Sequence, residues 1–152
     1  MIIYDAILSN KRIIFAGSRN LSITHIQNFM FAAASMVSPP LYGIHNRILP
    51  YVPLVAMDSL MQVEGGFLAG VTNPMFVVTK KLYDVSIQID EGKLNADSSV
   101  IKEPYYELDK QFIKTLLVRI HAKTINDEEI RQAFHSYTQL MLDLAPINAY
   151  QN

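Results

Sequence analysis

Two short apolar runs, each containing a glycine, limit the folds that this chain can adopt. The first run is RIIFAG (Arg12–Gly17) and the second is FLAGV (Phe67–Val71). Apolar runs of this length are typical of buried strands. A segment with helical spacing, Ile23–Val37, lies between them, and Ser22 precedes it as a capping residue. Because parallel strands need crossover connections of this kind, the pattern predicts an α/β fold.

Further short elements fit the same pattern. RILPYVPL (Arg47–Leu54) is rich in β-forming residues but holds two prolines, which cannot donate to a ladder, so we expect an edge or interrupted strand. YDVSIQI (Tyr83–Ile89) alternates apolar and polar residues, and the DEGK that follows it predicts a hairpin turn. Two short helices are also expected, at Ile2–Leu8 and Met57–Val63.

The end of the chain predicts a helical pair, with the second helix opened by a capping box of Asn126 and Glu129. The expected buried stripes are Leu108, Phe112, Leu116 and Ile120, and then Ile130, Phe134, Tyr137, Met141 and Leu144. We therefore expect a mixed, mostly parallel central sheet flanked by helices, with a C-terminal helical pair. Residues 1–94 would form the α/β core, residues 95–104 a polar loop, and residues 105–152 helices packed on the same lobe.

Composition and charge exclude several classes of function. The chain has 152 residues, enough for one domain with a sizeable core, and 50% of them are hydrophobic, which is too many for a disordered chain. A net charge of −1 offers no footprint for nucleic acid and no general attraction to anionic lipid. Cysteine is absent, so disulfides and cysteine nucleophiles are excluded. Ile23–Val37 is too short and too polar to span a bilayer, and we expect a soluble, cytoplasmic chain with no transmembrane segment.

Residues for conventional catalysis are scarce. No two of the four histidines have the i, i+4 spacing of a helical metal site, and the chain has neither a Walker loop nor a GxSxG nucleophile elbow. Asp127, Glu128 and Glu129 occupy the first turn of a predicted helix, where negative charge complements the helix dipole. Asp84 and Asp90 flank a predicted strand as turn residues. A pair of carboxylates for acid/base chemistry stays open as an alternative, although no pair is singled out, and we expect no cofactor and no metal.

The segment GFLAGVTNPMF (Gly66–Phe76) is where a partner contact is most plausible. Its apolar run stops at a TNP triplet, in which Asn73 is expected to cap a short helix that Pro74 begins. Met75 and Phe76 follow a strand end, and in open α/β sheets binding sites gather beyond the carboxyl ends of the strands. Both side chains could instead belong to the core, which is the default in an apolar chain.

A longer pattern carries a family resemblance. SMVSPPLYGIHNRILPYVPLVAMDSL (Ser35–Leu60), followed by GFLAGVTNPMF, resembles the central lobe of the DENN domain. The closest similarity is to its stabilisation-of-polarity-axis branch, through VSPP, an arginine, PYV and AGVTNP in that order. YDAILSNKRIIF (Tyr4–Phe15) also resembles the helix and strand that begin this lobe, and the resemblance thins after about Ile89.

The resemblance implies an α/β lobe and a function that needs no covalent chemistry. Many DENN proteins are guanine nucleotide exchange factors for Rab GTPases, and they grip the switch regions so that the nucleotide-free state is favoured. Members of the polarity-axis branch are linked instead to Arf-type GTPases, polarity cues and secretory traffic, and docking platforms are expected among them. By resemblance, the partner is a Rab-family or Arf-family small GTPase, and any association with membranes is peripheral and made through partners.

One feature departs from the DENN pattern. DENN proteins usually carry a longin-like lobe before the central one, and the GTPase docks across both lobes. Here Met1 stands directly before the segment that resembles the central lobe. The resemblance therefore implies either a fragment or a reduced protein that obtains a longin-like lobe from a partner chain.

Five residues are candidate partner contacts. Arg47 matches the arginine of the motif and could order its loop by bonding carbonyl groups, or pair with a carboxylate. Tyr51 belongs to the PYV segment, where it could lie in the core or at a lobe junction. Asn73 is the centre of the TNP signature, which could mark architecture rather than contact. Met75 and Phe76 are the residues that we most expect to touch a partner.

Three hypotheses for function follow, in order of preference. The first is a DENN-type lobe that binds a Rab-family GTPase and contributes to GDP/GTP exchange in vesicle traffic, as an exchange factor without covalent catalysis. The second is a non-catalytic adaptor that docks a GTPase or a polarity protein. The third, a small-molecule enzyme on an α/β fold, ranks last because no nucleophile, metal set or phosphate loop is present.

Overall fold

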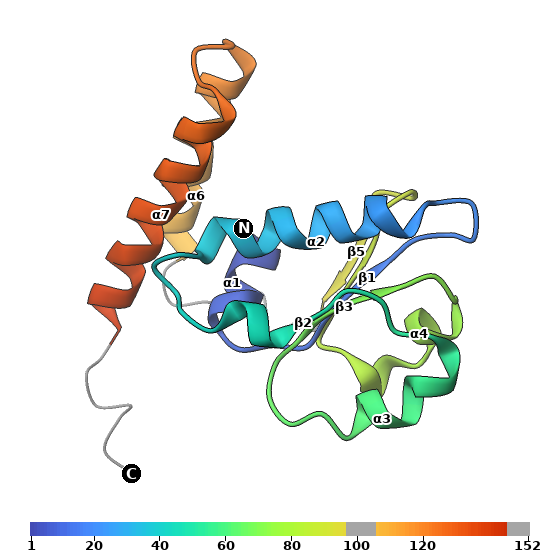
Figure 1. Ribbon diagram of the computed structural model, residues 1–152. Helices are drawn as coiled ribbons and strands as arrows, with labels where there is room; N and C mark the ends of the chain where they lie inside the picture. Colours follow the sequence, from blue (N-terminus) through green and yellow to red (C-terminus); the bar gives the residue numbers. More distant parts are fainter. Residues whose placement is uncertain (97–105, 146–152) are drawn as a thin grey trace.

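The computed structural model describes residues 1–96 and 106–145 (Figure 1). A central sheet carries helices on both faces, and two long helices at the end of the chain project from one side of it. In chain order the elements are α1 (Ile2–Leu8), β1 (Ile13–Ala16), α2 (Ile23–Val37), η1 (Ile44–Arg47), β2 (Ile48–Leu49), η2 (Leu54–Ala56), α3 (Met57–Met61), β3 (Leu68–Val71), α4 (Met75–Val78), η3 (Lys80–Leu82), β4 (Val85–Gln88), β5 (Lys93–Ala96), α6 (Tyr106–His121) and α7 (Asp127–Leu144). The predicted α/β architecture with a C-terminal helical pair is confirmed.

The sheet has five strands within the described residues, in the order β2-β3-β1-β4-β5. β1 lies in the middle and pairs in parallel with β3 on one side and with β4 on the other, while β2 pairs in parallel with β3. β5 is antiparallel to β4, because the turn predicted at Asp90–Lys93 joins the two strands as a hairpin. The prediction of a mixed, mostly parallel sheet is confirmed.

The strand β1 is buried on both faces, which assigns the helices to two layers. Ile13 and Phe15 lie in one apolar cluster with residues of α1, α2 and α7, while Ile14 and Ala16 lie in a second cluster with residues of α3 and α4. Successive side chains of a strand point to opposite faces, so α2 and the α3–α4 region cover opposite sides of the sheet. None of the four side chains is more than 6% exposed, and the buried strand predicted within Arg12–Gly17 is confirmed.

Two predicted helix starts are also present. The Ser22 hydroxyl accepts a hydrogen bond from the His25 amide at 3.2 Å and so satisfies one of the free amides at the start of α2. At the start of α7, the side chain of each of Asn126 and Glu129 accepts a hydrogen bond from the backbone amide of the other, both at 2.9 Å. This is the predicted capping box.

Two boundaries differ from the sequence prediction. β2 is an edge strand, in agreement with the two prolines that follow it, but it is short. Pairing continues past it through a hydrogen bond of 2.8 Å from the Val52 amide to the Gly70 carbonyl. The polar loop predicted at residues 95–104 begins later than expected, because Asn95 and Ala96 still pair with β4 as the end of β5. Residues 97–104 of that loop lie outside the described residues.

The C-terminal helices attach to the lobe through α7. Carbonyl groups in the last turn of a helix lack intrahelical partners. Two such carbonyls at the end of α2 find partners on α7. His135 Nε2 donates to the Ser35 carbonyl at 2.9 Å, and the Thr138 hydroxyl lies 3.3 Å from the Met36 carbonyl. The same hydroxyl is hydrogen bonded to the Tyr4 hydroxyl at 3.0 Å. Side chains of α7 therefore cap α2 and also bind α1.

An aromatic cluster fills the junction between the helical pair and the lobe. Phe112 of α6 stacks on Tyr137 of α7, with ring centroids 4.2 Å apart and planes 5° apart. Tyr4 of α1 contacts the rings of both Phe134 and Tyr137. The Tyr137 hydroxyl donates to the buried Asp109 carboxylate at 2.6 Å. Buried hydroxyls thus have partners at this junction, as their burial requires.

The two predicted stripes are buried only where the lobe lies against them. Leu116, Phe134 and Met141 are at most 8% exposed, whereas Ile120 and Leu144 are 38% and 44% exposed. Figure 1 shows that the helical pair crosses the end of α2 and extends past the lobe. The ends of the stripes are exposed because the described structure has nothing for them to pack against there.

Gly66 should not accept a side chain. A Cβ atom at this position would meet the Lys11 carbonyl oxygen at 2.7 Å and would come still closer to the Asn10 carbonyl group, and neither backbone group can rotate away. We expect Gly66→Ala to lower the free energy of unfolding by roughly 2 kcal/mol, measured by urea titration with circular dichroism. Gly92→Asn is the control, because its Cβ would meet nothing within 4 Å and Asn tolerates a positive φ. Equal losses in both variants would contradict this role of Gly66.

The Thr138 hydroxyl should be required for stable docking of α7. Thr138→Val keeps the shape of the side chain but leaves the Tyr4 hydroxyl without this partner. We expect the free energy of unfolding to fall by about 1–3 kcal/mol, the usual cost of a buried polar group without a partner. Thr138→Ser retains the hydroxyl, so it should lose clearly less in the same urea titration. If serine costs as much as valine, the hydrogen bond is not the source of the stability.

High pH should unfold the protein through its buried tyrosines. Burial raises the pKa of Tyr4 from 10.0 to about 12, and burial with the hydrogen bond to Asp109 raises that of Tyr137. The unfolded chain therefore releases these protons first, so the stability is complete below about pH 10 and is lost as pH rises towards about 12. Circular dichroism over this range should show the loss, and Tyr4→Phe should reduce it by up to roughly 2 kcal/mol. An unchanged pH dependence in Tyr4→Phe would contradict the assignment.

Candidate partner-binding site at the carboxyl end of the sheet

The connections that follow β1 and β3 leave the sheet on opposite faces. β1 leads into α2 on one face, and its neighbour β3 leads into α4 on the other. In open α/β sheets, a crevice forms where adjacent parallel strands diverge in this way, beyond their carboxyl ends. The topology therefore places a candidate site at the ends of β1, β3 and β4.

A crevice is present at this point. It has a volume of about 360 Å³ and is formed by segments at the ends of β1, β3 and β4. Its lining consists of Ala16, Gly17, Ser18, Arg19, Thr72, Asn73, Pro74, Val77, Val78, Gln88, Asp90 and Glu91. The TNP triplet thus forms one wall of the crevice, and polar residues that follow β1 and β4 form the opposite side.

Asp84 and Asp90, on either side of β4, form hydrogen bonds with residues just before and just after β1. The Ser18 amide donates to both Asp90 carboxylate oxygens, at 3.3 and 3.2 Å, and hydrogen bonding with Ser18 lowers the pKa of Asp90. At the other end of the strand, Asp84 accepts from the Arg12 amide at 2.8 Å and pairs with the Arg12 guanidinium at 3.2 Å. These contacts give both carboxylates a structural role at opposite ends of β4.

The TNP triplet begins a helix one residue later than predicted. Pro74, and not Asn73, stands at the N-cap position of α4. Asn73 still takes part, because its Oδ1 accepts a hydrogen bond from the Met75 amide at 3.0 Å. The role that the structure gives to Asn73 is therefore to order the turn that presents Met75.

Met75 and Phe76 are neighbours in sequence but lie in different environments. Met75 is 50% exposed, whereas Phe76 is fully buried in the cluster that covers the α3–α4 face of the sheet. Successive side chains of a helix are rotated by about 100°, so one of two neighbours can face the core while the other faces solvent. Phe76 is a core residue, which corrects the expectation that it contacts a partner.

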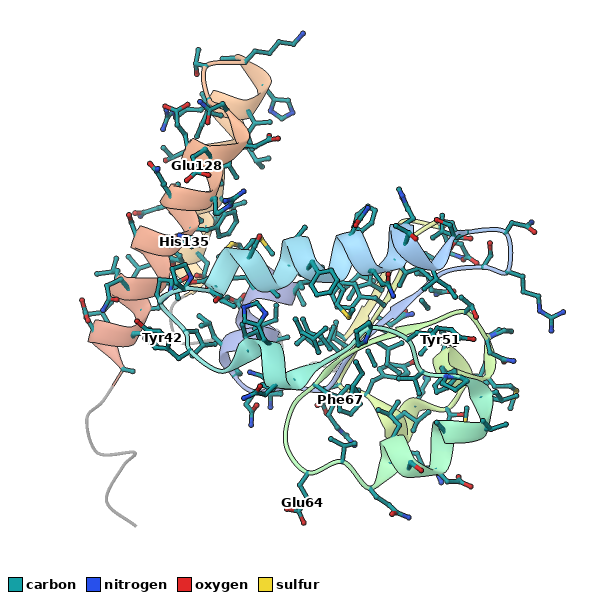
Figure 2. The ribbon with its side chains drawn as sticks, in the orientation of Figure 1. Tyr42, Tyr51, Glu64, Phe67, Glu128 and His135 are labelled. Carbon is teal, nitrogen blue, oxygen red and sulfur yellow. The ribbon has the colours of Figure 1, made fainter. Side chains whose placement is uncertain are left out.

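Tyr51, labelled in Figure 2, and Met75 both follow strands of the parallel part of the sheet. Tyr51 follows β2, which is parallel to β3, so both residues lie beyond strand carboxyl ends. Exposed apolar side chains gather in these two segments. We call this group the carboxyl-end face: Tyr51, Leu54, Val55, Met75 and Val78, which are between 44% and 93% exposed.

Three members of the carboxyl-end face, Leu54, Val55 and Val78, were not expected from the sequence. The sequence did hold a signal for Leu54 and Val55. The apolar segment PLVA (Pro53–Ala56) comes after Pro50, which ends strand β2, and it is too short to form a helical stripe. Val78 also lines the crevice, so the crevice and the face adjoin. Exposed apolar patches bordered by polar residues are typical of protein–protein contact sites.

Arg47 lies away from this face, at the amino end of the sheet. Its Nε donates to the Gly66 carbonyl at 3.1 Å, and its Nη1 donates to the Ile7 carbonyl at 3.2 Å. Burial of the guanidinium lowers the pKa of Arg47. Gly66 precedes β3 and Ile7 belongs to the last turn of α1, so Arg47 connects segments that enter the sheet. The carbonyl-bonding role is thus the one that the structure shows, and the fold does not bring Arg47 together with Met75.

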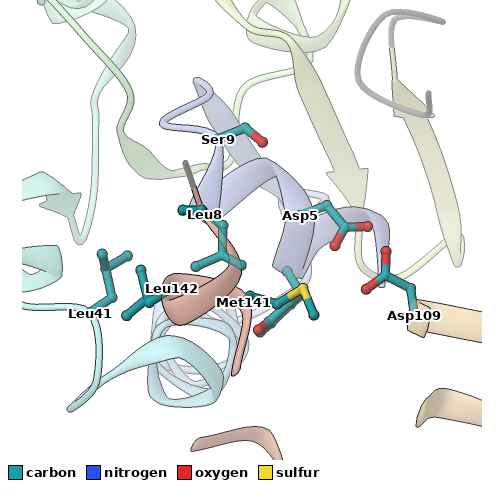
Figure 3. Close-up of a pocket in the computed structure, with 9 residues that line it drawn as sticks. Asp5, Leu8, Ser9, Leu41, Asp109, Met141 and Leu142 are labelled. Atoms are coloured by element: carbon teal, nitrogen blue, oxygen red, sulfur yellow. The ribbon is translucent and has the colours of Figure 1, made fainter. Parts of the chain in front are cut away.

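A second hollow, of about 190 Å³, lies between α1 and the helical pair (Figure 3). The carboxylates of Asp5 from α1 and Asp109 from α6 approach each other there, and no sequence pattern indicated it. Each aspartate stands in the first turn of its helix, where a carboxylate complements the dipole, and Asp109 also accepts the Tyr137 hydroxyl. These local roles account for both carboxylates, so we regard the hollow as a structural junction.

Among residues 1–96 and 106–145, no group of three or more histidine, aspartate or glutamate side chains is arranged to hold a metal ion. Within this part of the chain, no helix combines the length and the apolar character needed to cross a membrane.

Comparison with known proteins supplies the family. A family model described as stabilization of polarity axis matches residues 1–98, which include the crevice and the whole carboxyl-end face. The AFI1-like protein C776.06c of Schizosaccharomyces pombe is 26% identical over 184 aligned residues. The alignment covers 98% of this chain but 29% of the relative, so the chain spans less than a third of the relative's length.

The family match covers more than half of the chain. It confirms the polarity-axis part of the predicted resemblance, while the DENN domain assignment stays a prediction. The chain belongs to the stabilization of polarity axis family.

Proposed function

We propose that the chain is a DENN-type lobe that binds a Rab-family small GTPase and contributes to GDP/GTP exchange in membrane traffic. The observation that carries this proposal is the carboxyl-end face, where five exposed apolar side chains lie beyond β2 and β3 within the segment that matches the polarity-axis family. Burial of such side chains against a partner releases about 25 cal/mol per Å² of apolar surface. The face therefore has the composition of a protein contact.

Nucleotide exchange requires binding but no covalent chemistry, so a contact surface without catalytic residues could perform it. An exchange factor acts by binding the nucleotide-free GTPase more tightly than the loaded form, and a 100-fold preference corresponds to about 2.8 kcal/mol. Such discrimination needs contacts in a fixed orientation. In α4, the buried Phe76 anchors the helix and Asn73 orders its first turn, so Met75 and Val78 are held outward by a rigid support.

The lobe is proposed to act together with further protein. The relative from Schizosaccharomyces pombe is much longer than the segment that it shares with this chain, of which 29% is covered. We propose that a longin-like lobe, in the same chain or in a partner, supplies the remaining contact with the GTPase. The description of the family supports a role of this assembly in cell polarity.

Docking without exchange is a second candidate function, and the chemistry of the face favours it. All members of the carboxyl-end face are uncharged, so none of them can compete with the phosphates or the metal ion of a bound nucleotide. In this alternative the chain is an adaptor that holds a Rab-family or Arf-family GTPase, or a polarity protein, without releasing its nucleotide.

A GTPase panel distinguishes exchange from docking. Rab and Arf proteins loaded with fluorescent GDP are mixed with the chain, alone and with a longin-like lobe supplied, and nucleotide release is followed. Faster release supports exchange. Tighter binding to the GTP-loaded form, without faster release, supports docking. Equal affinity for the loaded and empty forms across the panel would contradict both functions.

Val78→Asp should disrupt binding in either case. A carboxylate placed in an apolar contact loses its water without gaining a partner, so we expect binding to weaken at least tenfold, or about 1.4 kcal/mol, in a titration with the responsive GTPase. Val118→Asp on α6 is a matched control, because Val118 is 63% exposed and Val78 is 66% exposed. The control should bind like the unaltered protein. Equal effects of the two substitutions would show that the carboxyl-end face is not the contact.

A further inference from the structure

A separate concavity lies where α7 crosses the end of α2. It has a volume of about 350 Å³, and we call it the α2–α7 concavity. Its lining consists of Phe31, Ala34, Ser35, Ser38, Pro39, His45, Arg131 and His135. Figure 2 shows His135 at this crossing. Since α2 starts after the carboxyl end of β1 and is about 22 Å long, the concavity lies far from the carboxyl-end face.

The lining of the α2–α7 concavity is basic. Arg131 is a permanent cation, and the rings of His45 and His135 each offer a nitrogen that can donate a hydrogen bond. Two serine side chains also line it, and no carboxylate does. Glu128 pairs with Arg131 at 3.1 Å from the preceding turn of α7, outside the lining. A partner that enters the concavity therefore meets hydrogen-bond donors and positive charge.

A structural contact explains why His135 is at this position, but none explains the positions of Arg131 and His45. A carbonyl oxygen only accepts, so the contact with Ser35 places a hydrogen on His135 Nε2 and gives this side chain a capping role. The ion pair of Arg131 with Glu128 joins side chains that are 51% and 58% exposed, and such exposed pairs add little to stability. The imidazole of His45 is exposed and has no hydrogen-bond or ion-pair partner among the described residues.

We infer that the α2–α7 concavity binds an acidic segment of a partner protein, with a carboxylate on Arg131 and His45 and an apolar side chain against Phe31. The guanidinium group offers paired donors whose geometry matches a carboxylate. Phe31 is 46% exposed and supplies an apolar wall beside these donors. Arginine and aromatic residues are enriched together at protein interfaces. This surface is independent of the proposed GTPase contact.

The shape of the site favours a protein segment over a membrane surface. Anionic lipid attracts clusters of several lysines and arginines. The α2–α7 concavity has one arginine and no lysine in its lining, and its basic groups are gathered in a hollow between a helix crossing and a short turn. A single acidic side chain can enter such a hollow, whereas a flat layer of headgroups cannot follow it.

A nuclear magnetic resonance titration tests the inference. The ¹⁵N-labelled protein is titrated with a blocked Leu-Glu-Leu-Glu peptide, and in parallel with Leu-Gln-Leu-Gln, which has the same shape without charge. We expect the acidic peptide to shift the amide signals of Ser35, His45 and Arg131 saturably, and the uncharged peptide to shift them little. The midpoint of the saturable shift gives the dissociation constant.

Three substitutions make the test specific. Arg131→Gln removes the cation and should weaken binding of the acidic peptide about fivefold, while Glu128→Gln releases Arg131 from its ion pair and should strengthen binding about twofold. Arg119→Gln is the matched control, because it removes the same charge from an ion pair with Glu129 at 3.7 Å, outside the concavity. It should leave the dissociation constant unchanged. Melting temperatures within about 4 °C of the unaltered protein will show that the variants are folded.

Several outcomes would overturn the inference. One is the absence of saturable shifts up to about 10 mM peptide, which corresponds to negligible affinity. Another is an equal response of Arg131→Gln and Arg119→Gln, or shifts centred on another surface. Binding of phosphatidylserine vesicles through Arg131, without a response to the peptide, would assign the concavity to membranes instead of a protein segment.

Discussion

The parallel pairing of β1 on both of its edges is the constraint on which the rest of the lobe depends. The strand is bonded to β3 and β4 and is buried on both faces, so each face of the sheet must be covered. The chain meets this need by sending the connection after β1 to one face and the connection after β3 to the other. A crevice at the carboxyl ends of the strands is the geometric result. The candidate site therefore arises from the same topology that buries the core.

The helical pair is attached to the lobe by the aromatic cluster at the junction and by a few hydrogen bonds. His135 and Thr138 supply hydrogen-bonding groups to the carbonyls at the end of α2, and Thr138 also meets Tyr4 in the first helix. The first and last described helices are thereby joined, and α7 becomes part of the lobe. This crossing also forms the α2–α7 concavity, so the contacts that attach the helical pair create a binding surface as well.

Sequence patterns located most elements but only part of the site. Ser22 and the capping box at Asn126 predicted two helix starts correctly, because a cap acts within one turn. The exposure of Met75 and the burial of Phe76 could not be separated in advance, since packing against distant segments decides which side of α4 faces the sheet. For Arg47, carbonyl bonding was one of two open alternatives, and only the fold shows which carbonyls it reaches.

By itself, the sequence determined the fold class and the family. The fold class could be predicted because apolar runs, prolines and caps act on the backbone within a few residues. The family could be predicted because its pattern is a linear order of such signals. Only the tertiary structure decided which side chains are available to a partner. Exposure depends on what other segments cover, as the burial of Phe76 beside the exposed Met75 shows. Contacts such as Tyr4 with Thr138, or Asp5 beside Asp109, join distant parts of the chain. They follow from how the helices pack on the sheet, which no local signal encodes.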